Sequence, residues 1–324
     1  MIEEINQRPI ALVLGATGGI GGAVAQKLHA RGWRIRALNR NAEAAAKREH
    51  AFQWIQGDAM KPDDVLKAAV GVNLIVHAVN PPGYRDWEKL VLPMLDNTIA
   101  AARAAGARIV LPGTVYNFGP DAFPILTEDS PQHPVTKKGA IRVEMERRLK
   151  LASEGGTGVV IVRAGDFFGP GARNSWFSQG IITEGKPVTS VKNPAARDVG
   201  HQWAYLPDVA EIMVRLIERA DQLPPFAVYH MEGFWDADGR QLVAAIQRVV
   251  GHNVKVKSFP WWLLSVMVPF IALMRELREM RYLWQEPLRM RNDRLVATLG
   301  QEPRTAIDEA VRATLVAHGC LSPA

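Results

Sequence analysis

Several features that mark particular protein classes are scarce in this sequence. Its 324 residues include a single cysteine, Cys320, which excludes an intrachain disulfide and predicts a reducing compartment. The residues around Cys320 lack metal-ligand spacing, and we predict no metal site. Aromatic residues make up 7% of the chain, and no tract of Lys and Arg is interleaved with them, so we expect no nucleic-acid partner.

Long apolar runs are also scarce. The first ten residues include Glu3, Glu4 and Arg8 and lack an apolar core, so we expect no signal peptide and a cytoplasmic protein. The most apolar stretch, Phe259–Met274, is shorter than the roughly 20 residues that a membrane span needs, and Pro269 interrupts it. Arginines and acidic residues follow this stretch. A helix over the substrate pocket, a dimer helix and a helix lying on a membrane surface all remain open.

The rest of the composition is that of an ordinary soluble globular protein. Hydrophobic residues make up 48% of the chain and charged residues 22%, and the formal net charge of +6 is mild for this size. Such a charge favours an anionic ligand or surface. The length suits one large domain or a domain with a smaller lobe.

A glycine-rich turn near the start carries the strongest signal. An apolar strand over 10–14 runs into Gly15-x-x-Gly18-x-x-Gly21, and a helical pattern follows up to Gly32. Such a turn brings backbone N–H groups and a helix N-terminus against a pyrophosphate, with glycines where a Cβ would block the approach. The spacing is a variant of the usual G-x-G-x-x-G fingerprint. The cofactor-binding residues predicted here are Gly15, Thr17, Gly18, Gly19, Ile20 and Gly21.

The end of the second strand indicates which dinucleotide binds. The alternating segment 33–38 ends at Asn39-Arg40, with no carboxylate to hold a ribose 2′-hydroxyl. An Arg at this place accommodates a 2′-phosphate. We therefore predict that Asn39 and Arg40 bind the cofactor and that NADP is favoured over NAD, although Arg40 is also consistent with a solvated surface cation.

Three further strands are expected at 52–56, 74–80 and 108–111, with helical segments between them. This strict alternation predicts an α/β fold, a Rossmann-like doubly wound parallel sheet, in which ligands bind beyond the carboxyl ends of the strands. His77 is typical of a packed core histidine, and Gly57-Asp58 of either an adenine contact or a turn with a helix cap. The cofactor residues predicted at these strand ends are Asp58, Ala59, Ala78, Val79 and Asn80.

With these motifs in place, the chain resembles the extended short-chain dehydrogenase/reductase superfamily, in its NAD-dependent epimerase/dehydratase branch. The motifs that carry the resemblance, in chain order, are 15–21, 57–58, 115–116, 163–171 and 204–210. The resemblance implies an NAD(P)-binding domain over 1–165, with 203–232 returning to it, and a smaller C-terminal substrate lobe built from 166–202 and 233–324. It also implies catalysis by Ser or Thr, Tyr and Lys, and a homodimer through the helices near 86–105 and 137–153.

The sequence departs from this family pattern at the catalytic helix. Alignment of Glu144 with the family's usual Glu places Thr136 where Tyr is expected and Ala140 where Lys is expected. The remaining catalytic candidates are Thr114, as the hydroxyl that holds a carbonyl oxygen, and Tyr116, as a displaced acid. Turn chemistry at Thr114 and simple packing at Tyr116 are the alternatives.

The lobe supplies aromatic and polar side chains for a small-molecule substrate. The substrate-binding candidates are Phe167, Phe168, Arg173, Trp176 and His201. The leading hypothesis is an oxidoreductase or epimerase-like enzyme that transfers hydride to or from a small carbonyl or alcohol, in the cleft between sheet and lobe. One alternative is an NADPH-binding sensor, regulator or assembly factor with little or no turnover. Another is a peripheral membrane enzyme, which the Trp-rich apolar stretch suggests.

Overall fold

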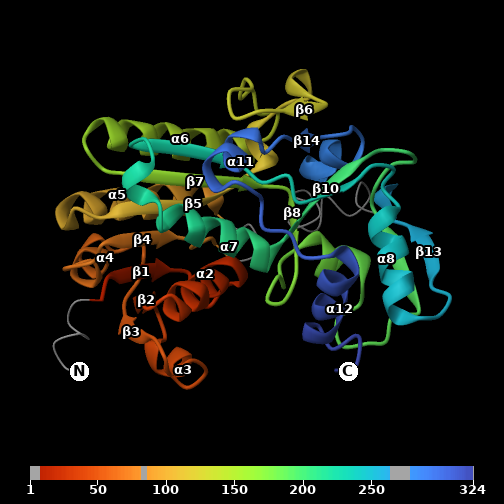
Figure 1. Cartoon of the computed structure of the whole chain (residues 1–324), viewed down its shortest axis with the longest axis horizontal. Coiled ribbons are helices and arrows are strands. Elements are labelled where there is room, and N and C mark those ends of the chain that lie inside the picture. The colour runs from red at the N-terminus through yellow and green to blue at the C-terminus, as the bar shows by residue number, and fades with distance from the viewer. Residues whose placement is uncertain (1–7, 82–85, 263–277, 324) are drawn as a thin grey trace. The chain divides into compact units, whose positions relative to one another are not determined.

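The computed structural model describes residues 8–81, 86–262 and 278–323 (Figure 1). The chain divides into two compact units, each assembled from three separate segments. Unit 1 comprises Met1–Gly113, Ile141–Arg163 and Ala210–Tyr229, and unit 2 comprises Thr114–Ala140, Ala164–Val209 and His230–Ala324.

Unit 1 is built on a seven-stranded sheet with the strand order β11-β7-β5-β4-β1-β2-β3. The strands are β1 Ile10–Leu14, β2 Arg34–Asn39, β3 Gln53–Gln56, β4 Leu74–His77, β5 Arg108–Thr114, β7 Val159–Ala164 and β11 Phe226–His230. Strand β1 pairs in parallel with both β2 and β4 at the centre of the sheet. The predicted Rossmann-like, doubly wound parallel sheet is confirmed, and β11 is the predicted returning strand.

Helices cover both faces of this sheet, which explains why its central strands are apolar throughout. Along β1, Leu12 and Leu14 join a core cluster with residues of α4 Pro62–Ala68, α5 Trp87–Ala105 and α6 Lys137–Glu154. The alternate residues Ala11 and Val13 are equally buried and point to the other face. Figure 1 shows α2 Gly19–Ala30 and α7 Leu206–Ile217 together on the side away from α5 and α6. Helix α3, Ala42–Ala46, is a single short turn after β2.

Unit 2 has short strands in three small sheets in place of one large sheet. The sheets are β12-β10-β8, β13-β9 and β14-β6. Their strands are β6 Ile125–Leu126, β8 Asp166–Phe168, β9 Ser190–Asn193, β10 His201–Tyr205, β12 Phe234–Asp236, β13 Lys255–Ser258 and β14 Arg289–Met290. The helices described here are α8 Gln241–Val250, α11 Asp293–Leu299 and α12 Ile307–Ala317.

The main core of unit 2 is rich in aromatic rings. Phe168, Phe177, Trp203 and Trp284 pack against the apolar faces of α8 and α12. Most of the apolar stretch Phe259–Met274 lies outside the described residues, since these end at 262 and resume at 278. Among the helices of the described ranges, none is long and apolar enough to cross a membrane.

Candidate functional site

The glycine turn of unit 1 is shaped by close backbone contacts. Gly15 has φ +93°, and a Cβ there would lie 2.5 Å from the carbonyl oxygen of Ala78 at the end of β4. A Cβ on Gly21 would lie 2.3 Å from the carbonyl oxygen of Gly15. The N–H of Gly18 donates to that same carbonyl at 2.9 Å and closes the turn. No other residue type fits at positions 15 and 21 without displacing the backbone.

Helix α2 begins directly after this turn and has an open N-terminus. Its N-cap is Gly18, with no side-chain cap, and its first turn carries no acidic residue. The first N–H groups of a helix have no partner within the helix, and the helix dipole is positive at this end. The site therefore offers unpaired backbone donors and positive potential without a competing carboxylate, which is the chemistry that binds a pyrophosphate.

The end of β2 lies beside the turn, as the sequence predicts. Nδ2 of Asn39 is 3.4 Å from Oγ1 of Thr17. Arg40 is exposed, and its backbone carbonyl accepts a hydrogen bond from the Gln56 amide. Oδ1 of Asn39 accepts from the N–H of Asn41, which fixes the loop after the strand. The structure thus brings Thr17, Asn39 and Arg40 to one edge of the sheet and leaves the guanidinium on the surface.

The other predicted cofactor residues lie at the ends of β3 and β4. Oδ1 of Asp58 accepts from the N–H of Met60, so this carboxylate caps its own turn. The Ala59 side chain is buried. Ala78 and Val79 are half-buried and Asn80 is exposed, directly after β4. The N–H of Ala78 donates to the carbonyl of Leu14, which ties this strand end to the glycine turn.

His77 is a core histidine. Its Nδ1 lies 2.7 Å from Oγ1 of Thr98. Burial, with a smaller contribution from the Arg142 charge, lowers its pKa from the ordinary value of 6.5 to about 3. The ring is therefore neutral across the physiological range and cannot supply a proton there.

The two predicted catalytic residues share one turn of unit 2. Thr114 is the N-cap of the 3-10 turn Val115–Asn117, and its Oγ1 accepts from the N–H of Tyr116 at 3.3 Å. Both residues are half-buried. Since the Thr114 oxygen accepts from the backbone, its hydroxyl hydrogen is left to donate to another acceptor.

The start of α6 is organised differently from the family pattern. Oγ1 of Thr136 accepts from the N–H of Gly139 at 3.0 Å, so Thr136 acts as a helix cap. A Cβ on Gly139 would lie 2.2 Å from the carbonyl oxygen of Tyr116, so the glycine lets the helix start lie against the turn that holds Thr114 and Tyr116. Ala140 is exposed.

A buried ion pair identifies a different glutamate of α6 as the internal one. Arg163 of β7 makes two contacts to Glu146, Nη2 to Oε2 at 2.6 Å and Nε to Oε1 at 3.1 Å. Glu144 instead lies near the surface and pairs with Arg147 and Arg148. Hydrogen bonds from these two arginines hold its pKa down to about 2.

With Glu146 as the anchor, the positions where the family resemblance implies Tyr and Lys hold Lys138 and Arg142. Lys138 is buried, with Nζ 4.0 Å from Oε2 of Glu279. The Arg142 guanidinium lies 5.2 Å from the centre of the Trp87 ring. Neither residue is among the site residues predicted from the sequence. The sequence did offer one signal for this alternative alignment, which is the second glutamate, Glu146, two positions after Glu144.

The predicted aromatic substrate residues have different surroundings. Phe168 is a core residue, with its ring centre 5.8 Å from Phe177 and 5.3 Å from Tyr205. Phe167 points to the opposite face of β8 and is half-buried. Trp176 is also half-buried, and its ring lies 5.2 Å from Trp284. Of the three predicted residues, Phe167 and Trp176 retain exposed surface that a ligand could contact.

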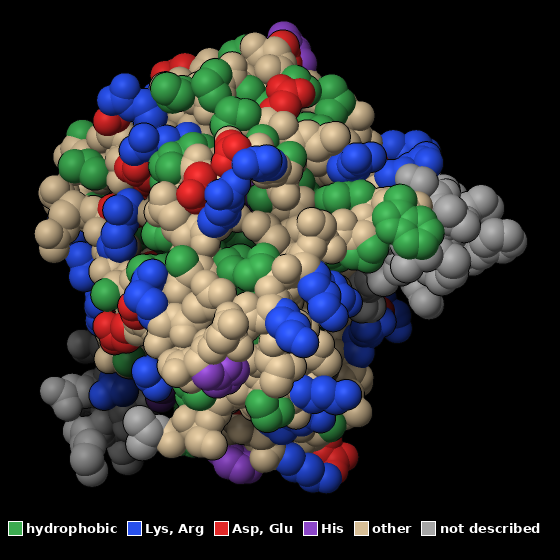
Figure 2. Space-filling model, turned by 90° about the vertical axis from the view of Figure 1, so that its right-hand side faces the viewer, with side chains coloured by type: hydrophobic (Ala, Val, Ile, Leu, Met, Phe, Trp, Pro, Cys, Tyr) green, Lys and Arg blue, Asp and Glu red, His purple; other side chains and the backbone are tan. Residues whose placement is uncertain are grey.

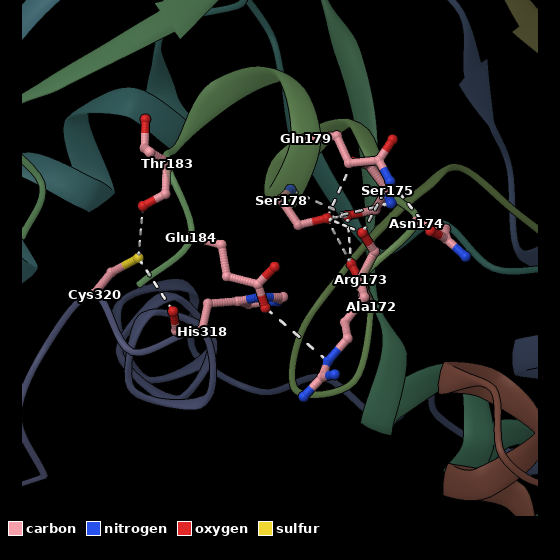
Figure 3. A network of polar contacts seen from close by, with 10 residues as sticks. All are labelled: Ala172, Arg173, Asn174, Ser175, Ser178, Gln179, Thr183, Glu184, His318 and Cys320. Atoms are coloured by element: carbon pink, nitrogen blue, oxygen red, sulfur yellow. Dashed lines mark hydrogen bonds and ion pairs between the residues drawn. The ribbon is translucent and has the colours of Figure 1, made fainter. Parts of the chain in front are cut away.

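Arg173 lies in a loop whose shape is set by serine hydroxyls (Figure 3). Oγ of Ser178 donates to the Arg173 carbonyl at 2.7 Å. The guanidinium reaches toward Glu184, with Nε 4.0 Å from Oε1, and remains 79% exposed. Glu184 also lies 3.2 Å from Nδ1 of His318. Arg173 is thus an accessible cation with a weak ionic partner.

His201, the last predicted substrate residue, faces Asp166, which sequence reasoning did not select. Nε2 of His201 lies 2.9 Å from Oδ2 of Asp166. Both side chains line a small pocket that is partly open to solvent and whose interior has room for about one water molecule or one substrate oxygen. The sequence signal available for Asp166 was a carboxylate at the start of a short strand after Arg163.

Several exposed arginines of unit 2 are accompanied by acidic side chains. Arg240 pairs with Asp198 at 2.7 Å, and Arg248 with Asp308 at 2.5 Å. Figure 2 shows Lys and Arg side chains scattered over one face of the molecule, with acidic side chains next to several of them. On this face the positive charge is dispersed and does not form a single patch.

The glycine turn, the open helix N-terminus and the doubly wound sheet define a Rossmann-like protein of the dinucleotide-binding class. The chain belongs to the NAD dependent epimerase/dehydratase family, whose model matches residues 11–231.

One known relative matches about half of the chain. A 3-diazoavenalumate denitrifying reductase from a Streptomyces species is 31% identical over 176 residues, which are 49% of this chain and 57% of that protein. The chain thus spans little more than half the length of this relative.

Solved structures match almost the whole chain. The match to the crystal structure of gox2253 includes 97% of this chain and 100% of the gox2253 chain, with a TM-score of 0.74 and 22% identity. The match to MoeE5, solved in complex with UDP-glucose and NAD, includes 95% of this chain and 98% of the MoeE5 chain, with a TM-score of 0.71 and 17% identity. At these identities the similarity shows the fold.

Proposed function

We propose that the protein is an NADP-dependent oxidoreductase that transfers hydride to or from a small carbonyl or alcohol substrate. The open N-terminus of α2, with Gly15 and Gly21 packed against neighbouring backbone, is the observation that carries this proposal. When bound there, the nicotinamide cofactor would supply or accept the hydride. The reductase relative favours redox chemistry over simple binding.

The preference for NADP rests on the end of β2. Asn39 and the exposed Arg40 lie at the end of β2, where this fold usually carries the residue that selects the ribose 2′-substituent. The side chain of Arg40 can pair with a 2′-phosphate, whereas a carboxylate would be needed to hold a 2′-hydroxyl. Thr17, whose hydroxyl lies 3.4 Å from the Asn39 amide, is proposed to contribute a hydroxyl to the same group.

Thr114 and Tyr116 are the groups proposed to hold the reacting oxygen of the substrate. Two hydroxyl donors from one turn stabilise the negative charge that develops on a carbonyl oxygen when its carbon accepts a hydride. The carbonyl then becomes an alcohol, with one hydride on carbon and one proton on oxygen. Phe167 and Trp176 supply apolar contacts, and Arg173 supplies a charge for an anionic substituent.

The proposal is tested by following NADPH oxidation over a panel of small aldehydes and ketones. Thr114→Ala and Tyr116→Phe should each lower kcat by roughly 100-fold, the usual loss for one such donor. Thr189→Ala, at an exposed position, and Tyr205→Phe are the matched controls. The Tyr205 ring packs against the core residue Phe168, with ring centres 5.3 Å apart, so removal of its hydroxyl should leave turnover unchanged.

A second function, an NADPH-binding sensor or regulator without turnover, is favoured by one observation. Whether α6 is aligned on Glu144 or on Glu146, the position of the family's catalytic phenol holds no tyrosine: Thr136 caps the helix and Lys138 is buried. NADPH binding without oxidation on any carbonyl of the panel would favour this second function. Turnover that neither Thr114→Ala nor Tyr116→Phe reduces would show that these two residues do not hold the substrate oxygen.

A further inference from the structure

Asp166 and His201 form a buried hydrogen-bonded pair on the neighbouring strands β8 and β10. Nε2 of the imidazole lies 2.9 Å from Oδ2 of the carboxylate, and the His201 and Asp166 side chains are 8% and 12% exposed. Gly165 permits this approach, because a Cβ there would lie 2.2 Å from the carbonyl oxygen of Gln202. A larger residue at position 165 would push β8 and β10 apart and would break the contact between Asp166 and His201.

Two indoles fix the orientation of the imidazole. The Trp284 ring is stacked on it, with centres 3.7 Å apart and planes 6° from parallel. The Trp203 ring meets it at an angle of 62°, with centres 4.9 Å apart. An aromatic face also stabilises a protonated imidazole through its quadrupole, so this arrangement tolerates both charge states of the ring.

The pair lines a pocket whose other walls cannot exchange protons. Val115, Leu283 and Leu288 are apolar. The Gln202 amide also lines the pocket. Its nitrogen donates to the backbone carbonyl of Glu232, and its oxygen accepts from the backbone N–H of Met290. Asp166 and His201 are therefore the titratable groups that line this pocket.

Other ionisable groups near the pair are engaged or neutral. Asp236 is the register partner of His201 on β12, and its carboxylate accepts two backbone N–H groups at the start of α8. Burial, together with the charges of Glu279 and Asp166, raises the pKa of Tyr282 above its ordinary value. That phenol keeps its proton near neutral pH. An imidazole, by contrast, exchanges its proton in this range.

We propose that His201, positioned by Asp166, exchanges the proton with the substrate oxygen in the redox reaction proposed above, on which this inference rests. In reduction, the carbonyl carbon accepts the hydride and the C=O π electrons move to oxygen. The oxygen takes the proton from Nδ1 of the imidazolium, which leaves neutral His201 with its Nε2–H on Asp166. Solvent then returns the proton to Nδ1. In oxidation, neutral His201 accepts the hydroxyl proton as the hydride leaves.

The test measures kcat for carbonyl reduction from about pH 5 to pH 9, the range in which an imidazole titrates. His201→Gln keeps an amide donor for Asp166 and removes the exchangeable proton. This variant should lower kcat by roughly 100-fold, the typical contribution of a general acid, and should abolish the fall in kcat as the pH rises. Asp166→Asn should lower kcat with little change in KM, since Asp166 positions the acid and does not hold the substrate.

Two further variants separate the proton donor from its alternatives. His252→Gln, at an exposed histidine of the same unit, should match the wild-type protein in kcat and pH dependence. Tyr116→Phe should lower kcat and keep the pH dependence. A His201→Gln enzyme that retains the wild-type pH dependence, with or without a lower kcat, would overturn the proposal. Loss of that dependence in Tyr116→Phe alone would assign the proton to the phenol and also overturn it.

A second readout needs no turnover. A protonated imidazole stacked on an indole quenches its fluorescence, so the wild-type emission should fall as the pH is lowered. The step should be absent in both His201→Gln and Trp284→Phe. A wild-type protein that shows this step but oxidises no NADPH would overturn the proposed function while upholding His201 as a proton-exchanging group. Identical titrations of wild type and His201→Gln would overturn the inference itself.

Discussion

Each of the two units contains a buried pair of an acidic and a basic side chain, and the two pairs differ in what they can do. In unit 1, Glu146 and Arg163 are 7% and 2% exposed and make two short contacts. In unit 2, Asp166 and His201 are nearly as buried but line a pocket. A guanidinium stays charged at any physiological pH, whereas an imidazole does not. The first pair can therefore only hold structure together, and the second can also carry a proton.

The largest effect is expected from breaking the permanent pair. Arg163→Met leaves the Glu146 carboxylate buried without its partner and should lower the free energy of unfolding by about 3–5 kcal/mol. The double variant Glu146→Met with Arg163→Met should recover most of this loss, because no unpaired charge remains. Urea unfolding measures the free energy of unfolding of the single and the double variant.

Glu144→Gln provides the matched control on the same helix. Glu144 pairs with two arginines near the surface, so its loss should change the unfolding midpoint little. A small effect of Arg163→Met, comparable with that of Glu144→Gln, would contradict the structural role assigned to the buried pair.

The next effect concerns the glycine turn. Gly15→Ala combines a positive φ with a contact of 2.5 Å to the Ala78 carbonyl. We expect a loss of about 2–3 kcal/mol, together with loss of NADPH binding. Gly32 also has a positive φ, +86°, but a Cβ there would meet no atom within 4 Å, so Gly32→Ala should cost only about 1 kcal/mol and leave binding intact. Equal effects of the two substitutions on NADPH binding would show that the turn does not approach the cofactor.

A third prediction compares the two buried histidines. The folded protein keeps His77 neutral, with a pKa of about 3, while the unfolded chain protonates it near its ordinary value of 6.5. The unfolded state then binds more protons in this window. His77 should therefore reduce stability by up to about 1.4 kcal/mol per pH unit as the pH falls from 6.5 toward 3.

The measurement is the slope of the unfolding free energy against pH for wild type and His77→Gln. The slope between pH 6.5 and 4 should be smaller in the variant, since the group responsible is gone. An unchanged slope would mean that His77 takes up its proton in the folded state and is not the inert counterpart of His201.

The smallest effect is expected for the surface network between α2 and α7. Burial alone would raise the pKa of Glu211, but hydrogen bonds from Arg215, Lys27 and Arg31 outweigh it and hold the pKa to about 2. The ionised Glu211 carboxylate therefore stabilises the folded state fully above pH 4.5, the ordinary pKa of the group. This stabilisation is lost as the pH falls toward 2. Glu211→Gln should cost about 1 kcal/mol at neutral pH.

The difference between wild type and Glu211→Gln should shrink between pH 4.5 and pH 2, which urea midpoints at several pH values can show. Glu43→Gln, in the exposed pair with Lys47, is the control and should have no measurable effect. A difference that stays constant down to pH 2 would exclude the ionised carboxylate as its source.

Much of unit 1 could be predicted because its signals are local. The apolar strand over 10–14, the glycine spacing and the Asn39-Arg40 strand end can each be recognised from a few consecutive residues, and the structure places them together. The strict alternation of strands and helices then determines the sheet. Helix α6 was harder to interpret because burial of Glu146 depends on Arg163, which lies on a different element. Glu144 and Glu146 cannot be distinguished by helical periodicity alone.

Unit 2 could be predicted only in part because its elements are short. Strands of two to five residues carry too little alternation to show which face is buried. Phe168 was predicted to contact the substrate, but its ring packs in the core with residues of α8 and α12. The Asp166–His201 pair is separated by 35 positions in the chain, so only the pairing of β8 with β10 brings the two side chains together.

The most direct test of the account is a thermal-shift titration of the whole chain with NADPH, NADP⁺, NADH and NAD⁺. A dinucleotide at about a hundred times its Kd should stabilise the folded state by roughly 2.7 kcal/mol, which gives a clear shift in Tm. We predict stabilisation by NADPH and NADP⁺ in preference to the other two, with that preference lost in Arg40→Asp. No shift with any of the four would contradict a dinucleotide site at the glycine turn.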